Sequence, residues 1–208
     1  MITVDVSAAR AVITLNRPDK ANALTAAMLG DLVGAVGEAA GREDVNAVIL
    51  TGVGRVFSAG ADLDEVRAGT LAKNPLWEEL SGTVAACPVL TIAALNGSLA
   101  GGAMGMALAC DMRVAVPEAR FFYPVMKMGV LPQPSDPARL AALVGPARAK
   151  LLLMGAEKID AGTALAWGLI DAIDPDSLAA AMRLSEAAAS ASRDHVAAVK
   201  AATRGREA

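Results

Sequence analysis

The sequence predicts an α/β protein, and three observations support this class. Apolar segments typical of buried strands alternate along the chain with segments of helical spacing. Hydrophobic residues make up 54% of the 208 residues and aromatic residues only 3%, so small aliphatic side chains must build the core. Such a core suits helices packed closely on a sheet. A strand, a glycine-bearing turn and an Ala-Gly-small triplet also occur twice, about forty positions apart, which indicates an internal repeat.

The elements of the first third follow in order. Residues 2–6 and 11–15 are expected to form short strands, because apolar and polar residues alternate there. Thr25 is expected to cap a helix that continues to about residue 40. The next segment, NAVILTG at residues 46–52, is apolar throughout and is typical of a strand buried on both faces. A polar helix start follows at Asp62.

The later elements continue the alternation. A helix is expected at residues 75–86, a buried strand at 88–95, and further strands at 111–116 and 119–124. From residue 147 most of the chain reads as helix, with a short break at GLIDAI and one long helix from about Ser177 to Thr203. We expect a single domain over residues 1–208. Its core spans about residues 1–160, and a shortened helical C-terminal part spans about 161–208.

Charge and composition argue against several classes of function. The net charge is −3 and no run of Lys or Arg is present, so nucleic-acid binding has no electrostatic support. The N-terminus is strand-like, and every long apolar stretch is interrupted, so we expect a cytoplasmic protein without a membrane segment. Cys87 and Cys110 are expected to be reduced core residues. No metal-binding cluster can be assembled, and the lone His195 is expected at a surface or an interface.

Glycines crowd the point where an apolar strand passes into a helix, in the segment LNGSLAGGAMGMALACD. A helix N-terminus presents backbone N–H groups without partners and a partial positive charge. Two such termini, at Ala61 and Gly102, could direct N–H groups at one oxygen and form an oxyanion hole. Each donor would contribute roughly 3–4 kcal/mol in a dry site. Close packing of strand on helix is the alternative reason for small residues there.

The chain resembles the crotonase family of enoyl-CoA hydratases and isomerases. Segments in the order that this family shows are NRPDKANAL, VILTGVGRVFSAGADL, LNGSLAGGAMGMALACDMRVA, MGVLP and GLIDAI, within residues 2–173. The resemblance implies a spiral of repeated ββα units and a coenzyme A thioester as substrate, with no permanently bound cofactor. It also implies a homo-oligomer, either a trimer or a pair of trimers.

The resemblance assigns roles to individual residues. The thioester oxygen would lie between the N–H groups of Ala61 and Gly102. The substrate-binding residues carried over from the family are Lys20, Ala21, Ala59, Ala61, Asp62, Leu63 and Asp64. Lys20 and Ala21 would lie near the nucleotide, although Lys20 reads equally well as a solvated turn residue. Asp62 fits a helix N-cap better than a catalyst.

The chain departs from the family at the two catalytic glutamates of the hydratases. Those positions align with Gly105 and Val125, and neither side chain can move a proton. Asp136 is a substitute acid or base, or else it caps a helix that begins at Pro137. Tyr123 is a further candidate, although a strand tyrosine is more often packed with its hydroxyl satisfied.

The sequence therefore favours an acyl-CoA enzyme that stabilises a thioester enolate. With no glutamate pair, isomerase or lyase chemistry is more plausible than hydration. The rival hypothesis is a non-catalytic acyl-CoA-binding homologue or subunit that kept the backbone donors and lost the chemistry.

Overall fold

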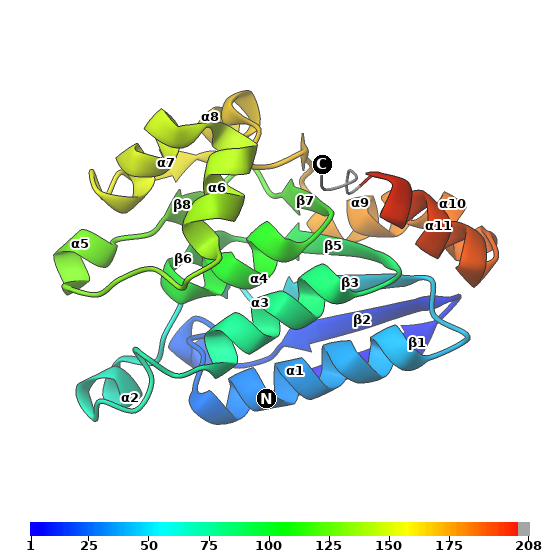
Figure 1. Cartoon of the computed structure of the whole chain (residues 1–208), viewed down its shortest axis with the longest axis horizontal. Helices are drawn as coiled ribbons and strands as arrows, with labels where there is room; N and C mark the ends of the chain where they lie inside the picture. The colour runs from blue at the N-terminus through cyan, green and yellow to red at the C-terminus, as the bar shows by residue number, and fades with distance from the viewer. Residues whose placement is uncertain (204–208) are drawn as a thin grey trace.

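A computed structural model describes residues 1–203 and contains two sheets covered by helices (Figure 1). The larger sheet has the strand order β1-β2-β3-β5-β7-β10, in which only the β1–β2 hairpin is antiparallel. Its strands are β1 (Ile2–Ser7), β2 (Arg10–Leu15), β3 (Ala47–Gly52), β5 (Leu90–Leu95), β7 (Met112–Ala115) and β10 (Ala172–Ile173). The prediction of an α/β class is confirmed.

The smaller sheet has the order β4-β6-β8-β9. Its strands are β4 (Val56–Ser58), β6 (Ser98–Ala100), β8 (Arg120–Phe122) and β9 (Ile159–Asp160). Three times the chain leaves a strand of the larger sheet, forms a short strand in the smaller one, and enters a helix. The first two of these units are the copies of the sequence repeat, and β4 pairs with β6 in parallel. The repeat therefore places equivalent turns next to each other.

Helices α1 and α3 cover one face of the larger sheet, and α9 covers the other. The helices of the first two thirds are η1 (Pro18–Lys20), α1 (Ala26–Gly41), α2 (Leu63–Arg67), α3 (Leu76–Ala86), η2 (Gly101–Ala103), α4 (Met104–Ala109) and α5 (Val125–Met128). Those that follow are α6 (Asp136–Val144), α7 (Pro146–Leu153), α8 (Ala161–Trp167), α9 (Ser177–Leu184), α10 (Glu186–Ser190) and α11 (Arg193–Thr203). Over residues 1–203, none of these combines the length and apolarity needed to cross a membrane.

The core lies mainly between the larger sheet and the α1/α3 layer. Thr25 caps α1 as predicted, because its hydroxyl accepts a hydrogen bond from the Met28 N–H at 3.2 Å. On the other side of the sheet, Ile49, Ile92 and Val114 pack with alanines of α9. Burial on both faces explains why the strands are apolar throughout.

The expected long helix at residues 177–203 is wrong: three helices, α9, α10 and α11, occupy this stretch. The chain becomes extended at Ala191, with φ −88° and ψ 170°, and the Ala191 carbonyl accepts a hydrogen bond from the Asn46 side chain at 2.8 Å. Arg10 binds the Ser185 hydroxyl at 2.8 Å where α9 ends. Contacts from Arg10 in β2 and from Asn46, directly before β3, therefore accompany the two breaks. The last five residues of the expected C-terminal part, 204–208, lie outside the described residues.

Candidate active site

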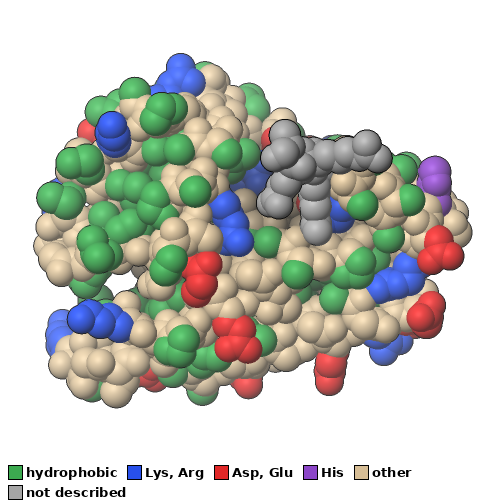
Figure 2. Space-filling model, in the orientation of Figure 1, with side chains coloured by type: hydrophobic (Ala, Val, Ile, Leu, Met, Phe, Trp, Pro, Cys, Tyr) green, Lys and Arg blue, Asp and Glu red, His purple; other side chains and the backbone are tan. Residues whose placement is uncertain are grey.

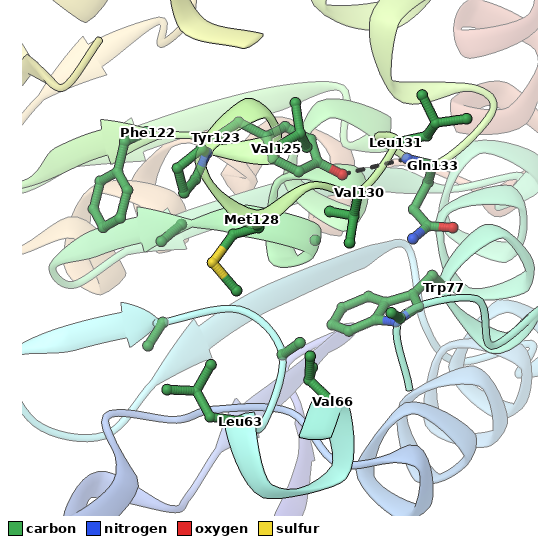
Figure 3. A pocket seen from close by; sticks show the side chains of 17 residues that line it. Leu63, Val66, Trp77, Phe122, Tyr123, Val125, Met128, Val130, Leu131 and Gln133 are labelled. Carbon is green, nitrogen blue, oxygen red and sulfur yellow. Dashed lines mark hydrogen bonds between the residues drawn. The ribbon is translucent and has the colours of Figure 1, made fainter. Parts of the chain in front are cut away.

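A largely apolar cavity of about 160 Å³ lies where α2 and α5 face each other. Leu63, Val66 and Trp77 form one wall, and side chains of residues 122–131 form the other (Figure 3). Residues of segments 59–61 and 100–102, together with Ala72 and Gln133, complete the lining. Figure 2 shows hydrophobic side chains gathered over the α5 side, where the surface is hollowed next to α2. Within residues 1–203, the lining contains no charged side chain.

The two Ala-Gly-small triplets meet at this cavity. Gly60 and Gly101 both have positive φ, +91° and +55°, a conformation that side chains disfavour. A Cβ atom on Gly60 would lie 2.8 Å from the Ala100 carbonyl oxygen, so the two backbone segments touch. Glycine is therefore favoured by backbone conformation at the middle of both triplets, and at Gly60 it is also required by space.

Ala61 and Gly102 follow these two glycines. The backbone N–H of each makes no hydrogen bond within the β-bridge or helix to which the residue belongs. Around Ala61, the Leu24 N–H binds the Gly60 carbonyl at 2.7 Å, and the Asp62 N–H binds the Leu24 carbonyl at 2.9 Å. In a parallel bridge of this kind, the N–H of the central residue faces away from the partner strand. Gly102 lies in the first turn of η2, where N–H groups have no partner within the helix. Both residues line the cavity.

Gly102 also lies against the indole ring of Trp77. A Cβ atom at this position would approach the ring to 3.1 Å, closer than ordinary contact. The ring is fixed, because its Nε1–H donates to the Leu71 carbonyl at 3.0 Å. The absence of a side chain at Gly102 therefore keeps the backbone open to the cavity beside a rigid aromatic wall.

Asp62 serves as the N-cap of α2, as the sequence suggested. Its carboxylate accepts hydrogen bonds from the N–H groups of Asp64 at 3.0 Å and Glu65 at 3.3 Å. It also pairs with Arg17 at 2.7 Å, and this guanidinium, followed by the capping N–H groups, lowers the pKa of Asp62. Its hydrogen-bonding capacity is satisfied within the protein, which is typical of a structural residue.

The other substrate-binding residues carried over by resemblance divide into two groups. Ala59, Ala61 and Leu63 line the cavity. Lys20, Ala21 and Asp64 are not among its lining residues. Lys20 is exposed on η1, and Ala21 follows it with φ +50°. Asp64 is exposed and pairs with Arg67 at 3.1 Å.

The two positions to which the sequence resemblance assigned missing glutamates, 105 and 125, have different surroundings. Val125 lines the cavity. Gly105 is buried in α4, one turn beyond Gly102. A Cβ atom on Gly105 would lie 2.8 Å from Oδ1 of Asp136, so the Asp136 carboxylate borders the space that a side chain at position 105 would need.

The interpretation of Asp136 as a helix cap is wrong. Helix α6 begins at Asp136 itself, and Ser135 is the N-cap residue, with no side-chain cap. The Asp136 side chain is fully buried and points instead toward Tyr123, whose hydroxyl donates to Oδ2 at 2.8 Å. Among the described residues, Oδ1 has no hydrogen-bond partner. Burial raises the pKa of Asp136 to about 6, and the Tyr123 hydrogen bond opposes this shift.

Tyr123 separates Asp136 from the cavity. It lines the cavity with only 3% of its surface exposed, and its hydroxyl accepts a long hydrogen bond of 3.4 Å from the Gln133 backbone N–H (Figure 3). Burial raises the pKa of Tyr123, and the neighbouring Asp136 carboxylate raises it further. The phenol therefore stays protonated at neutral pH.

Sequence reasoning missed the aromatic and loop residues of the walls, above all Trp77 and Gln133. A tryptophan in a chain with only 3% aromatic residues was a usable signal. Gln133 carried none, because its place depends on how the proline-rich loop folds. His195 is exposed on α11, away from the cavity, as expected.

Known proteins resemble this chain along almost its whole length. The enoyl-CoA hydratase/isomerase family model matches residues 5–206. The protein named probable enoyl-CoA hydratase EchA14 of Mycobacterium tuberculosis is 38% identical over 198 residues, which cover 93% of this chain and 77% of that protein. A probable enoyl-CoA hydratase of Rhodobacter capsulatus is 37% identical over 179 residues, covering 84% and 69%.

Solved structures agree with the sequence relatives. An enoyl-CoA hydratase/isomerase family protein from Hyphomonas neptunium matches with a TM-score of 0.92 and 31% identity, covering 98% of this chain and 81% of that one. DspI of Pseudomonas aeruginosa matches with a TM-score of 0.90 and 31% identity, covering 98% and 86%. The expected crotonase-like fold, including its helical C-terminal part, is confirmed.

Proposed function

The chain belongs to the enoyl-CoA hydratase/isomerase family, and we propose that it binds a coenzyme A thioester and stabilises its enolate. The thioester oxygen accepts hydrogen bonds from the backbone N–H groups of Ala61 and Gly102. The acyl group occupies the apolar cavity between Trp77 and the α5 side.

The observation that carries this proposal is the meeting of the two triplets. Ala61 and Gly102 both line one cavity, and both follow a glycine with positive φ. Each keeps an N–H that its own element does not use. Two donors fixed by the backbone need no reorganisation when negative charge develops on an oxygen, which is the basis of oxyanion stabilisation.

The proposed reaction is either an isomerisation or a lyase reaction other than hydration. Hydration needs groups that activate water and protonate carbon, and Gly105 and Val125 supply neither. Asp136 is the proposed acid or base, because it is buried beside the cavity wall and has one oxygen without a partner.

The remaining residues that the resemblance assigns to substrate binding belong to the coenzyme A end of the proposed complex. Asp62 fixes the start of α2, and through it the positions of Leu63 and Asp64 at the rim. Lys20, exposed and positively charged, and Ala21 beside it are proposed to lie near the nucleotide. Assembly into trimers or paired trimers is part of the same proposal, and light scattering of the purified chain tests it.

Calorimetry tests the binding step. Butyryl-CoA is expected to bind more tightly than butyrate, because only the thioester carries the coenzyme A portion that the proposed residues around Lys20 and Asp64 contact. Butyrate alone is the control for the acyl group, and free coenzyme A is the control for the nucleotide. Equal affinity for butyryl-CoA and butyrate would contradict the proposal at its first step.

Substitutions at Gly102 test the donor itself. Gly102→Pro removes the N–H, and Gly102→Ala keeps it while adding the same Cβ contact with Trp77. We expect the Pro variant to lose at least about 100-fold more activity than the Ala variant, as for loss of one oxyanion donor. Activity is measured as exchange of the α-protons of butyryl-CoA in D₂O by NMR. Equal exchange by the two variants would mean that the glycine serves packing alone.

The reaction type is tested by comparing two substrates. Conversion of a 3-enoyl-CoA to its 2-enoyl isomer is expected to be about 100-fold faster than hydration of crotonyl-CoA. Robust hydration that survives Asp136→Ala would contradict the proposed site. A chain that binds butyryl-CoA but neither exchanges its α-protons nor isomerises would be the non-catalytic binder.

A further inference from the structure

We propose that Tyr123 and Asp136 form a proton relay in this site, in which Tyr123 touches the substrate and Asp136 holds the proton. The inference rests on the proposed function, because the cavity must receive a thioester. It identifies Tyr123 as the catalytic residue and Asp136 as the residue that acts through it.

The geometry requires both residues. Asp136 is fully buried and is not among the lining residues, so its carboxylate cannot reach an acyl chain directly. Tyr123 does line the cavity, and its hydroxyl lies 2.8 Å from Oδ2 of Asp136. The only route from the cavity to this carboxylate that the described residues provide by hydrogen bonding passes through the phenol.

Neither residue suffices alone. The phenol of Tyr123 stays protonated because burial and the Asp136 charge both disfavour the phenolate. It therefore cannot accept a proton unless it gives up its own at the same time. Asp136 is the acceptor in place for that proton, and burial strengthens it as a base compared with an exposed aspartate.

Gly105 is the third part of the arrangement. Oδ1 of Asp136 points at the position where a Cβ of residue 105 would lie, 2.8 Å away. A buried carboxylate oxygen without a donor is costly and rare, so packing alone gives no reason to keep it. A side chain at position 105 would displace the carboxylate. The glycine that replaces the family's glutamate therefore makes room for a different acid.

The step balances without a further reactant. As the α-C–H bond breaks, the phenolic oxygen of Tyr123 forms a bond to that proton, and the phenolic proton passes to Oδ2 of Asp136. The electron pair of the C–H bond enters the enolate, whose negative charge develops on the thioester oxygen beside the Ala61 and Gly102 N–H groups. The reverse transfers return the proton to the α-carbon, or to the γ-carbon of an enoyl chain.

The experiment uses Tyr123→Phe and Asp136→Asn, which keep the shapes of both side chains. The α-protons of butyryl-CoA are followed by NMR in D₂O, and butyryl-CoA affinity is measured by calorimetry. We expect each variant to lose at least about 100-fold in exchange rate, with affinity nearly unchanged. The double variant should be no worse than either single one, because the residues act as one unit.

The pH dependence distinguishes a relay from packing. In the parent chain, the exchange rate should rise with pH through about 6 as Asp136 loses its proton. Two charged groups influence the pKa of Asp136: Glu78 on α3 raises it, and Arg139 on α6 lowers it. The hydrogen bond from the Tyr123 hydroxyl also lowers the pKa of Asp136. Glu78→Gln should move this rise of the exchange rate to lower pH and leave the maximal rate unchanged. The residual exchange rate of Asp136→Asn should not rise with pH near 6.

Three outcomes would overturn the relay. If Tyr123→Phe exchanges at the parent rate while Asp136→Asn does not, Asp136 acts without the phenol. If both variants exchange at the parent rate, the pair is structural, although the proposed function survives. If the parent chain binds butyryl-CoA no better than butyrate, the proposed function itself fails. Circular dichroism of each variant establishes that loss of exchange is not loss of fold.

Discussion

Asp62 and Asp136 both stand at the start of a helix beside the same cavity, yet their surroundings are opposite. Asp62 receives two backbone hydrogen bonds and a salt bridge from Arg17. Asp136 receives one hydrogen bond, from Tyr123, and keeps one oxygen without a donor among residues 1–203. The sequence suggests a cap for both residues. The comparison teaches that the partners supplied by the fold, rather than position in a helix, separate a carboxylate whose oxygens are satisfied within the protein from the one that we propose as an acid or base.

The pKa shifts follow from these partners. The Arg17 guanidinium lowers the pKa of Asp62, so this carboxylate stays charged to a lower pH than an ordinary aspartate. Burial raises the pKa of Asp136 to about 6, close to the value at which a base exchanges protons readily near neutral pH. Three substitutions test the contrast.

The largest effect on stability is expected at Asp62. Asp62→Ala removes the cap of α2 and leaves Arg17, only 18% exposed in its side chain, without its partner. We expect the free energy of unfolding to fall by about 2–3 kcal/mol, measured by urea denaturation. Asp64→Ala is the matched control, since its pair with Arg67 is exposed, and it should change stability by less than about 0.5 kcal/mol. An equal loss in both variants would contradict the structural role of Asp62.

A smaller effect of opposite sign is expected at Asp136. Because folding raises this pKa above its unfolded value of 3.8, the native chain binds more protons than the unfolded chain between about pH 4 and 6. Stability attributable to this group is therefore lost as pH rises through that window, and the penalty is complete above pH 6.

Asp136→Asn removes the buried charge, so it should stabilise the protein at pH 8 by about 2 kcal/mol. The gain should vanish near pH 4, where the parent carboxyl is already protonated. Urea denaturation at both pH values measures it. A variant that is less stable than the parent at pH 8 would mean that the charge of Asp136 is satisfied in a way that the contrast with Asp62 does not allow.

The smallest effect is expected where the space around Asp136 is narrowed. Gly105→Ala places a Cβ 2.8 Å from Oδ1, so the carboxylate must shift, and we expect a net loss of about 1 kcal/mol together with slower α-proton exchange. Gly82→Ala, in α3 with nothing within 4 Å of the added Cβ, is the control. It should gain up to about 1 kcal/mol from helix propensity. Thermal unfolding of both variants decides, and a stabilised Gly105→Ala would show that the space is not limiting.

The local signals in the sequence were sufficient for much of the fold. The apolar strand segments and the cap at Thr25 depend on neighbouring residues, and the structure places them as predicted. The repeated triplets were visible because glycine is demanded by backbone conformation at Gly60 and Gly101. The cap at Asp62 was also predictable, because the N–H groups that it accepts lie two and three residues away.

The sequence did not determine what depends on distant contacts. The breaks between α9, α10 and α11 coincide with contacts from Arg10 and Asn46, which lie 175 and 145 residues away in the chain. The short strand β9 exists because it pairs with β8. Propensity alone favours continuous helix in so alanine-rich a segment.

The site divides along the same line. The sequence by itself determined that the backbone at Ala61 and Gly102 is kept clear, and that positions 105 and 125 carry no acid. Only the tertiary structure decided that the Asp136 side chain does not cap its helix. It lies beside Gly105 and accepts a hydrogen bond from Tyr123, 13 residues away in the chain. The physical reason is that a carboxylate takes its pKa from the groups that surround it, and those groups come from helices α3 and α6 and from the end of strand β8, which meet only when the chain packs.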